Sequence, residues 1–457
     1  MNHKGRFLTG IIIGLLMSSS GYGQSTAGAI FLLISPGARA GGMGEAQIAV
    51  ANDATASYWN PAGLAFLSGN ELSGMHVKWL PGLADDMTYD FLAYNQSLND
   101  FGSIGGHIIY LDAGKQTRTD SEGNIEGTFS TYFTSAALSY SALLTRTSSI
   151  GLNAKILYQH LADRATGTEQ GNPWSTDFGF DFGYLKRDAF NGLLDFATVL
   201  INVGPKISFI DENQADPMPT TLKFGFNLHA VQQQHNKLNI VYDVSKLVVA
   251  SYAAMDWDGD GWVGGYDENG RGGFVNGVPT ETKGYEYNQD GQIETTHSDP
   301  IYLAIFTSWV DDWLLGGDRD INSDRRIGGW DENGNNTFQE NQIVDGDTIT
   351  VTIRNFGDDG YGLYSSDKKL EVGNKNDRSI MNEINTLVHN VGIEYWYNDM
   401  FAIRGGYYYD FTGAIASPTF GFGLRFSNFG FDFGYTSAKK DTDPLANTMR
   451  YSLSYKF

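Results

Sequence analysis

Two acidic loops in the second half of the chain carry the residues best suited to bind a metal ion. In the first loop, positions 1, 3 and 5 are aspartates, position 6 is glycine, and position 12 is again a carboxylate. This is the spacing of an EF-hand-type calcium loop, in which position 7 supplies a backbone carbonyl. The predicted ligands are Asp256, Asp258, Asp260, Trp262 and Asp267. Aspartate at position 12 weakens bidentate ligation, and the alternative interpretation is a solvated turn.

A second loop repeats this pattern, because residues 327–334 (IGGWDENG) closely match residues 263–270 (VGGYDENG). Arg325 stands where position 6 is usually glycine, which strains the turn and adds a positive charge. We expect bound calcium to be structural, because crowded carboxylates repel one another without it. The corresponding ligands are Asp320, Asn322, Asp324, the carbonyl of Arg326, and Asp331.

Patterns typical of catalytic sites do not occur in the chain. The 8 histidines are scattered without an HExxH motif, there is no Cys, and neither a GxSxG turn nor a phosphate loop is found. Asp311 and Asp312 are adjacent, as solvated carboxylates often are. The sequence therefore predicts a protein that is not an enzyme, with structural calcium as its cofactor.

The acidity of the chain is concentrated in one segment. The formal net charge is −22, and residues 251–386 contain 26 Asp and Glu against 10 Lys and Arg. This balance argues against nucleic acid as a partner, since a phosphate backbone requires basic contacts. The composition is also rich in glycine and aromatic residues, with 56 Gly, 28 Phe and 25 Tyr, which is typical of outer-membrane barrels.

Most of the chain alternates between large apolar residues and small or charged ones, as in residues 420–426 (FGFGLRF) and 429–435 (FGFDFGY). An aromatic face opposite a small, polar face fits lipid outside and a filled lumen inside. The sequence therefore predicts an all-β fold, an antiparallel transmembrane β-barrel of about 14 strands. They are expected near residues 71–80, 87–96, 102–112, 129–140, 148–159, 176–187, 194–203, 220–229, 238–247, 387–397, 401–410, 418–426, 429–436 and 448–457.

The N-terminal region contains two segments outside this pattern. Residues 1–23 are typical of a secretory signal peptide, with Lys4 and Arg6 before a short apolar run. Residues 24–70 are rich in small residues and lack a period of two, which favours a plug packed inside the barrel. An ordinary N-terminal helix and loop is the alternative.

The lengths of the connections assign sides to the barrel. Connections after even-numbered strands are short, as at residues 398–400, whereas those after odd-numbered strands tend to be longer. Short periplasmic turns and long extracellular loops are the rule in such barrels. We therefore expect strands 1–9 in residues 71–250, an extracellular insertion at 251–386, strands 10–14 in 387–457, and a C-terminus beside the N-terminus. The terminal Phe457 resembles the assembly signal of outer-membrane proteins.

The N-terminal motifs carry a resemblance to a known family. Residues 36–40 (PGARA), 42–44 (GMG), 53–54 (DA) and 60–64 (NPAGL) occur in the same order as in the PorV/PorQ proteins, which are barrels related to the FadL transporters. The chain most resembles PorV of the type IX secretion system. The resemblance implies an outer-membrane protein that binds the C-terminal signal domain of secreted cargo. It also implies that cargo passes from a translocon barrel to a surface attachment complex, with membrane lipid as a further partner.

Two other functions remain open from the sequence. A FadL-like transporter would pass hydrophobic molecules through the lumen, and an apolar pocket with a lateral opening would favour it. A closed, charged lumen would favour cargo binding instead. The third possibility is a calcium-stabilised surface adhesin anchored by a barrel.

Overall fold

The computed structural model describes residues 27–81, 84, 86–119, 125–163, 173–208, 215–248, 301–309, 380–437 and 447–457, with short strands between 251 and 362. Two compact units divide the chain. The first comprises residues 1–248 and 385–457, and the second comprises residues 249–384. Each is described by itself.

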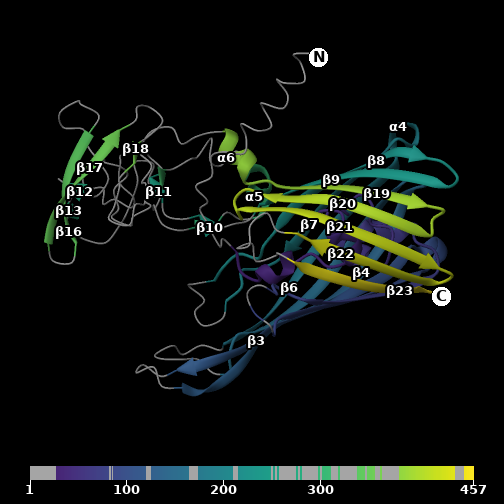
Figure 1. Cartoon of the computed structure of the whole chain (residues 1–457), viewed down its shortest axis with the longest axis horizontal. Helices are drawn as coiled ribbons and strands as arrows, with labels where there is room; N and C mark the ends of the chain where they lie inside the picture. The colour runs from purple at the N-terminus through teal and green to yellow at the C-terminus, as the bar shows by residue number, and fades with distance from the viewer. Residues whose placement is uncertain are drawn as a thin grey trace, which may run out of the picture. The chain divides into compact units, whose positions relative to one another are not determined.

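The first unit is a closed antiparallel barrel of fourteen strands, which confirms the predicted fold class (Figure 1). Each strand pairs with the next, and the first closes the barrel by pairing with the last, for example Leu72 with Tyr455. The strands are β1 (Asn70–Lys78), β2 (Thr88–Ser97), β3 (Ser103–Thr119), β4 (Ile125–Thr145), β5 (Ser148–His160), β6 (Trp174–Asp188), β7 (Leu194–Val203), β8 (Thr221–Gln232), β9 (Asn236–Leu247), β19 (Val388–Tyr397), β20 (Phe401–Asp410), β21 (Ile415–Phe426), β22 (Phe429–Thr436) and β23 (Thr448–Lys456).

The barrel is apolar outside, and its lumen contains buried charged residues as well as an apolar cluster. Leu453 and Phe429 are 66% and 62% exposed, whereas Glu394 and Arg450 are 0% and 1% exposed. Along β23 exposed and buried positions alternate, so each lumen-facing polar residue is flanked by outward-facing apolar ones. This arrangement places hydrocarbon against hydrocarbon and keeps buried charges where they can find partners.

No helix in the described part of the chain is both long and apolar enough to cross a membrane.

Strands β3 and β4 are longer than the sequence pattern predicted. β3 was expected to end at residue 112 and continues to Thr119, while β4 begins at Ile125 rather than near 129. A register shift between Asp112 and Lys115, with Gly114 at φ +81°, interrupts the pairing of β3 with β4 close to the level at which β2 begins, at Thr88. Beyond this point the two strands form a ribbon that extends past its neighbours (Figure 1). Polar residues occupy both of its faces, so period-two alternation could not reveal it.

Residues 27–67, here called the lumenal segment, lie inside the barrel. The segment contains four short helical turns, η1 (Ile30–Leu33), α2 (Ala38–Gly41), α3 (Ala56–Trp59) and η2 (Pro61–Phe66). Its backbone bonds to side chains on well-separated strands: Ala38 N–H donates to Ser452 on β23, and Gln47 N–H donates to Asp243 on β9. Contacts all around a closed sheet require an internal position.

The lumenal segment runs from one end of the barrel to the other before it enters β1. Gly28 N–H donates to Pro217 O in the connection after β7, while Asn70 and Phe457 pair at the other end of the barrel. The first described residues therefore lie at the opposite end of the barrel from the C-terminus, whereas the N-terminus itself, which was expected beside the C-terminus, lies outside the described residues. The lengths of the connections indicate on which side of the membrane each strand ends, but they contain no information about the path of a segment inside the barrel.

The described residues of the second unit form short strand pairs and two helices. β16 (Thr337–Val344), β17 (Asp347–Asn355) and β18 (Tyr361–Gly362) form one sheet. Three pairs of two-residue strands are β10 (Ser251–Tyr252) with β14 (His297–Ser298), β11 (Met255–Asp256) with β15 (Asp318–Arg319), and β12 (Phe274–Val275) with β13 (Val278–Pro279). The helices are α5 (Ile301–Thr307) and α6 (Ile380–Asn385), which extends one residue beyond this unit.

Candidate functional site

The candidate site is built around Arg39, which the lumenal segment presents to the barrel wall. Gly37, at φ +97°, turns the chain into the short helix α2, and its N–H donates to the sulfur of Met75. The N–H of Ala38 donates to Ser452 Oγ at 2.9 Å. These two bonds fix α2 against β1 and β23, so the side chain of Arg39 is directed across the lumen.

Arg39 forms a bidentate pair with Glu394 on β19, with both nitrogen–oxygen distances at 2.9 Å. Its third nitrogen contacts Asp53 Oδ2 at 3.1 Å and also Asn52 Oδ1. Paired guanidinium and carboxylate groups of this kind are among the strongest side-chain hydrogen bonds. The motifs at residues 36–40 and 53–54 are therefore linked by an ion pair, because Arg39 of the first contacts Asp53 of the second.

The pair continues into the wall as a row of alternating charges. Arg404 Nε donates to Glu394 Oε1 at 2.9 Å, and Arg404 Nη1 donates to Asp432 Oδ1 at 2.8 Å. Asp432 Oδ2 in turn accepts from Arg425 at 2.8 Å. We call this set the ion-pair cluster; its members are Arg39, Asp53, Glu394, Arg404, Asp432 and Arg425.

The ion-pair cluster is formally neutral, with three arginines and three carboxylates. The side chains of Arg404 and Glu394 are 0% and 1% exposed, so each charge depends on its partners rather than on water. Burial lowers the pKa of Arg39, but the charges of Glu394 and Asp53 raise it by more, and its pKa lies above the ordinary value. Arg39 therefore stays charged at any pH the membrane experiences.

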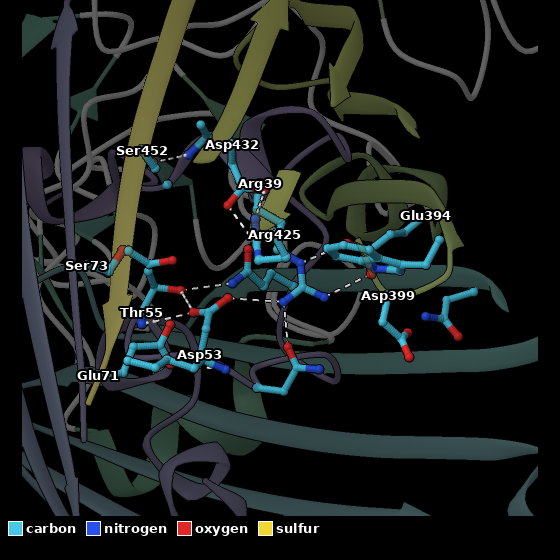
Figure 2. A pocket seen from close by; sticks show the side chains of 18 of the residues that line it. Arg39, Asp53, Thr55, Glu71, Ser73, Glu394, Asp399, Arg425, Asp432 and Ser452 are labelled. Carbon is cyan, nitrogen blue, oxygen red and sulfur yellow. Dashed lines mark hydrogen bonds and ion pairs between the residues drawn. The ribbon is translucent and has the colours of Figure 1, made fainter. Parts of the chain in front are cut away.

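A cavity of about 350 Å³ lies beside the ion-pair cluster, and Figure 2 shows Arg39 between Asp53 and Glu394 at this cavity. Its lining is mostly polar and comes from the lumenal segment, from strands β1, β9, β19, β21, β22 and β23, and from the turn after β19. The charged residues of the lining are Arg39, Asp53, Glu71, Lys237, Glu394, Asp399, Arg425, Asp432 and Lys456. Such a cavity suits water or a polar group and is unfavourable for a hydrocarbon.

Glycines on the wall allow the lumenal segment to approach the strands closely. A Cβ at Gly406 would lie 2.2 Å from Gly44 N, and one at Gly183 would lie 2.3 Å from Asn60 Oδ1. Asn60 uses that oxygen to accept from Ala62 N–H at 3.1 Å, and its amide donates to Tyr184 O. The motif at residues 60–64 is therefore a helix cap that is also bonded to the wall.

A second ion pair joins the lumenal segment to the last strand. Arg450 Nη2 donates to Glu45 Oε1 at 2.8 Å, and the guanidinium lies 5.8 Å from the ring of Trp79. Arg450 is 1% exposed, and its Nε and Nη1 have no hydrogen-bond partner among the described residues. Glu45 is therefore the carboxylate that compensates this buried charge.

The predicted calcium ligands lie outside the described residues, apart from the backbone at Asp256. There, Asp256 pairs with Asp318, two residues before the second loop begins. The backbone thus brings the starts of the two loops together. Within the part of the chain that the structure describes, no group of three or more His, Cys, Asp or Glu could hold a metal ion.

Sequence reasoning singled out Arg39 as part of a motif but did not find the ion-pair cluster. A signal was present, because Glu394, Arg404 and Asp432 are isolated charges on the lumen-facing side of otherwise apolar strands. Each such charge requires a buried partner. The sequence could not say which partner each one takes.

The fold and its lumen define an outer-membrane β-barrel. The family model described as "Type IX secretion system protein PorV" matches residues 21–253, just over half of the chain. The chain belongs to this family, as the resemblance of its N-terminal motifs suggested. No curated protein matches.

Solved structures of similar form are distant in sequence. The toluene transporter TbuX of Ralstonia pickettii is 11% identical, with a TM-score of 0.43 over 93% of this chain and 100% of that chain. The toluene transporter TodX of Pseudomonas putida is 11% identical, with a TM-score of 0.43 over 92% and 97%. A FadL homologue of Pseudomonas aeruginosa is 10% identical, with a TM-score of 0.38 over 96% and 100%. These likenesses carry no argument about function.

Proposed function

We propose that this protein is an outer-membrane component of type IX secretion that binds the C-terminal signal domain of secreted cargo. In this role it passes the cargo from the translocon barrel to the surface attachment complex. Membership of the PorV family is the observation that carries the proposal.

The interior of the barrel supports a binding role over a conducting one. The lumenal segment fills the lumen and is held by ion pairs, and the cavity at the ion-pair cluster is lined mainly by polar side chains. A second cavity, of about 140 Å³, is lined by charged residues beside apolar ones; they are Glu45, Lys223, Asp243 and Asp410, and Leu33, Ile48, Trp59, Leu247 and Val388. Hydrophobic molecules would have to cross these charges at a high desolvation cost. Members of the ion-pair cluster pair with one another, Glu45 pairs with Arg450, and Asp243 accepts backbone N–H groups of the lumenal segment, so we infer no catalytic role for them.

A deletion strain complemented with the wild-type gene tests this proposal. We expect proteins that bear the C-terminal signal domain to accumulate in the periplasm without the gene and to reach the cell surface with it. Purified signal domain should also bind the detergent-solubilised protein, whereas an unrelated β-sandwich domain should not. Normal cargo secretion in the deletion strain would refute the role.

Transport of a hydrophobic molecule is the second candidate, and one feature of the wall favours it. β7 pairs with β6 only from Phe180 to Lys186, so residues 174–179 of β6 have no partner on β7. Ile207 and Met218, 2% and 1% exposed, pack in the connection beside this interruption. A lateral passage would require this connection to move. Loss of uptake of a hydrophobic compound in the deletion strain, with secretion unchanged, would favour transport.

We further propose that the two acidic loops of residues 256–267 and 320–331 bind structural calcium. Calcium should protect residues 249–384 from proteolysis more than magnesium does, because it tolerates the irregular oxygen cages that such loops provide. Limited proteolysis of the solubilised protein, followed by mass spectrometry of the cleavage sites, measures this effect. An Asp267→Asn variant should lose most of the protection. Identical cleavage with calcium and with a chelator would rule out the sites.

A further inference from the structure

Glu71, on β1, is a buried carboxylate in the lining of the cavity beside the ion-pair cluster. It is 4% exposed, and its carboxylate accepts the backbone N–H of Ala54. Among the described residues, the one cation within 4.0 Å of this carboxylate is Lys456, whose Nζ lies 3.8 Å away, beyond hydrogen-bond distance. A buried carboxylate without a hydrogen-bonded cation is costly, so Glu71 has the capacity to accept from a further donor.

A second unsatisfied acceptor belongs to the lining of the same cavity. Gln47 is 1% exposed, and its Nε2 donates to Thr55 Oγ1 at 3.0 Å, whereas its Oε1 has no hydrogen-bond partner among the described residues. The backbone N–H of Thr55 donates to Asp53 Oδ1 at 3.0 Å, and Figure 2 shows Asp53, Thr55 and Glu71 together at one wall of the cavity. This wall is therefore rich in acceptors, and a ligand that fits it must be a donor.

The other charges of the lining are already compensated. The ion-pair cluster is formally neutral, and Lys237 lies 2.7 Å from Asp399. Glu71 and Lys456 are the two charges of the lining that remain. Water can satisfy the ammonium group of Lys456, because this side chain is 59% exposed, but it cannot reach the carboxylate of Glu71 as freely. The unmet requirement of the cavity is therefore for a cation rather than for an anion.

The cavity is reached from the end of the barrel that has the short connections. Asp399, in the turn after β19, and Lys456, at the end of β23, both line it and are both exposed. Short connections lie on the periplasmic side of outer-membrane barrels. The volume of about 350 Å³ lies at the lower end of the range of small-molecule pockets. A side chain or a small organic cation therefore has room to enter from the periplasm.

We propose that this cavity binds a cationic organic group, an ammonium or a guanidinium, that enters from the periplasm. Glu71 receives its charge, Gln47 Oε1 is a further acceptor, and Lys456 is displaced into water. The source is either a basic side chain of a periplasmic protein or a free small cation, since both carry the same group. A metal ion fits less well, because no group of three or more His, Cys, Asp or Glu in the described part of the chain could hold one.

The test is a calorimetric titration of the full-length protein in detergent with a capped pentapeptide of Gly and Ser that carries arginine at its centre. The control peptide carries citrulline instead, which has nearly the shape of arginine but no charge. We expect the arginine peptide to bind at least about tenfold more tightly, because a buried carboxylate discriminates strongly between charged and neutral donors. Methylguanidine distinguishes the two sources. Tighter binding of the peptide than of methylguanidine assigns the site to a protein side chain, whereas equal affinities assign it to a free cation.

Glu71→Gln and Asp399→Asn form a matched pair of variants. Each removes one negative charge from the lining, but Glu71 is buried and Asp399 is exposed. E71Q should weaken binding of the arginine peptide at least about tenfold, whereas D399N should change it less than about twofold. Lys456→Met should tighten binding about threefold, because the competing cation is removed. Retention of the folded band on unheated gels would show that the barrels are intact.

Three outcomes would overturn the proposal: no saturable binding of the arginine peptide, equal affinities for the arginine and citrulline peptides, or equal losses in E71Q and D399N. If E71Q does not fold, K456M decides, because weaker binding in that variant would also overturn the proposal. The peptides contain no signal domain, so failure here leaves the proposed secretion role untouched, and failure of the secretion assay leaves this site untouched.

Discussion

The lumenal segment is held differently by the two sides of the barrel. Against β19 and β23 it is held by the ion pairs Arg39–Glu394 and Glu45–Arg450. Against β2 to β7 it packs through apolar and aromatic side chains, and Leu64 lies in this cluster. An ion pair requires defined partner geometry, whereas an apolar surface tolerates small shifts. We infer that the charged side sets the register of the segment, whereas the apolar side buries side chains such as Leu64.

The charged side should show the largest effect of a single substitution. Glu394→Ala leaves Arg39 and Arg404 without their shared carboxylate, and we expect a loss of about 3–5 kcal/mol in the free energy of unfolding. Urea unfolding of the detergent-solubilised protein, followed by tryptophan fluorescence, measures this loss. A value below about 1 kcal/mol, as for an exposed pair, would show that the cluster does not hold the segment.

The apolar side should lose a comparable or smaller amount by a different mechanism. Leu64 is 0% exposed, so Leu64→Ala creates a cavity that costs about 2–5 kcal/mol. The same unfolding experiment at low and high salt separates the two mechanisms. The loss in L64A should not change with salt. A loss in L64A that disappears at high salt would contradict a purely apolar contact.

Close approach of the segment to the wall can be tested with two strand glycines. Gly183→Ala places a methyl 2.3 Å from the oxygen of Asn60. We expect it to cost about 1–3 kcal/mol through overpacking. Gly405→Ala is the matched control, because the nearest atom to its Cβ is Thr419 O at 4.0 Å. Equal unfolding midpoints for G183A and G405A would mean that the lumenal segment can shift at Asn60 to accommodate the added methyl group without loss of stability.

The smallest effect is expected at the exposed edge of the charged side. Lys237 and Asp399 lie 2.7 Å apart, but their side chains are 39% and 61% exposed. Asp399→Asn should therefore change the free energy of unfolding by less than about 1 kcal/mol, and the change should vanish at high salt. If D399N destabilised the protein as much as E394A does, the contribution of an ion pair to stability would not depend on its burial.

Much of the barrel was predictable because its signal is local. In residues 429–436 every second side chain faces lipid, and the paired strand shows the same period, so both strands can be recognised without knowing their neighbours. About fourteen barrel strands were predicted, and the described residues form a closed barrel of fourteen. The ribbon residues 115–119 and 125–128 were missed because most of their side chains are polar, so polar and apolar residues do not alternate there.

The candidate site was predictable only in part. The motif around Arg39 marked a segment packed among the strands, and small residues at 36–44 indicated close approach to a wall. Nothing in the neighbourhood of Arg39 identifies Glu394, which lies 355 residues further along the chain. Several lumen-facing carboxylates were equally plausible partners.

The sequence by itself determined which residues face lipid and which face the lumen, because that choice depends on side-chain polarity and on a period of two. Only the tertiary structure decided how the lumenal segment runs through the barrel and which charges neutralise one another. The reason is physical: ion pairs in a closed barrel depend on the shear and tilt that bring distant strands together, and these are properties of the whole sheet.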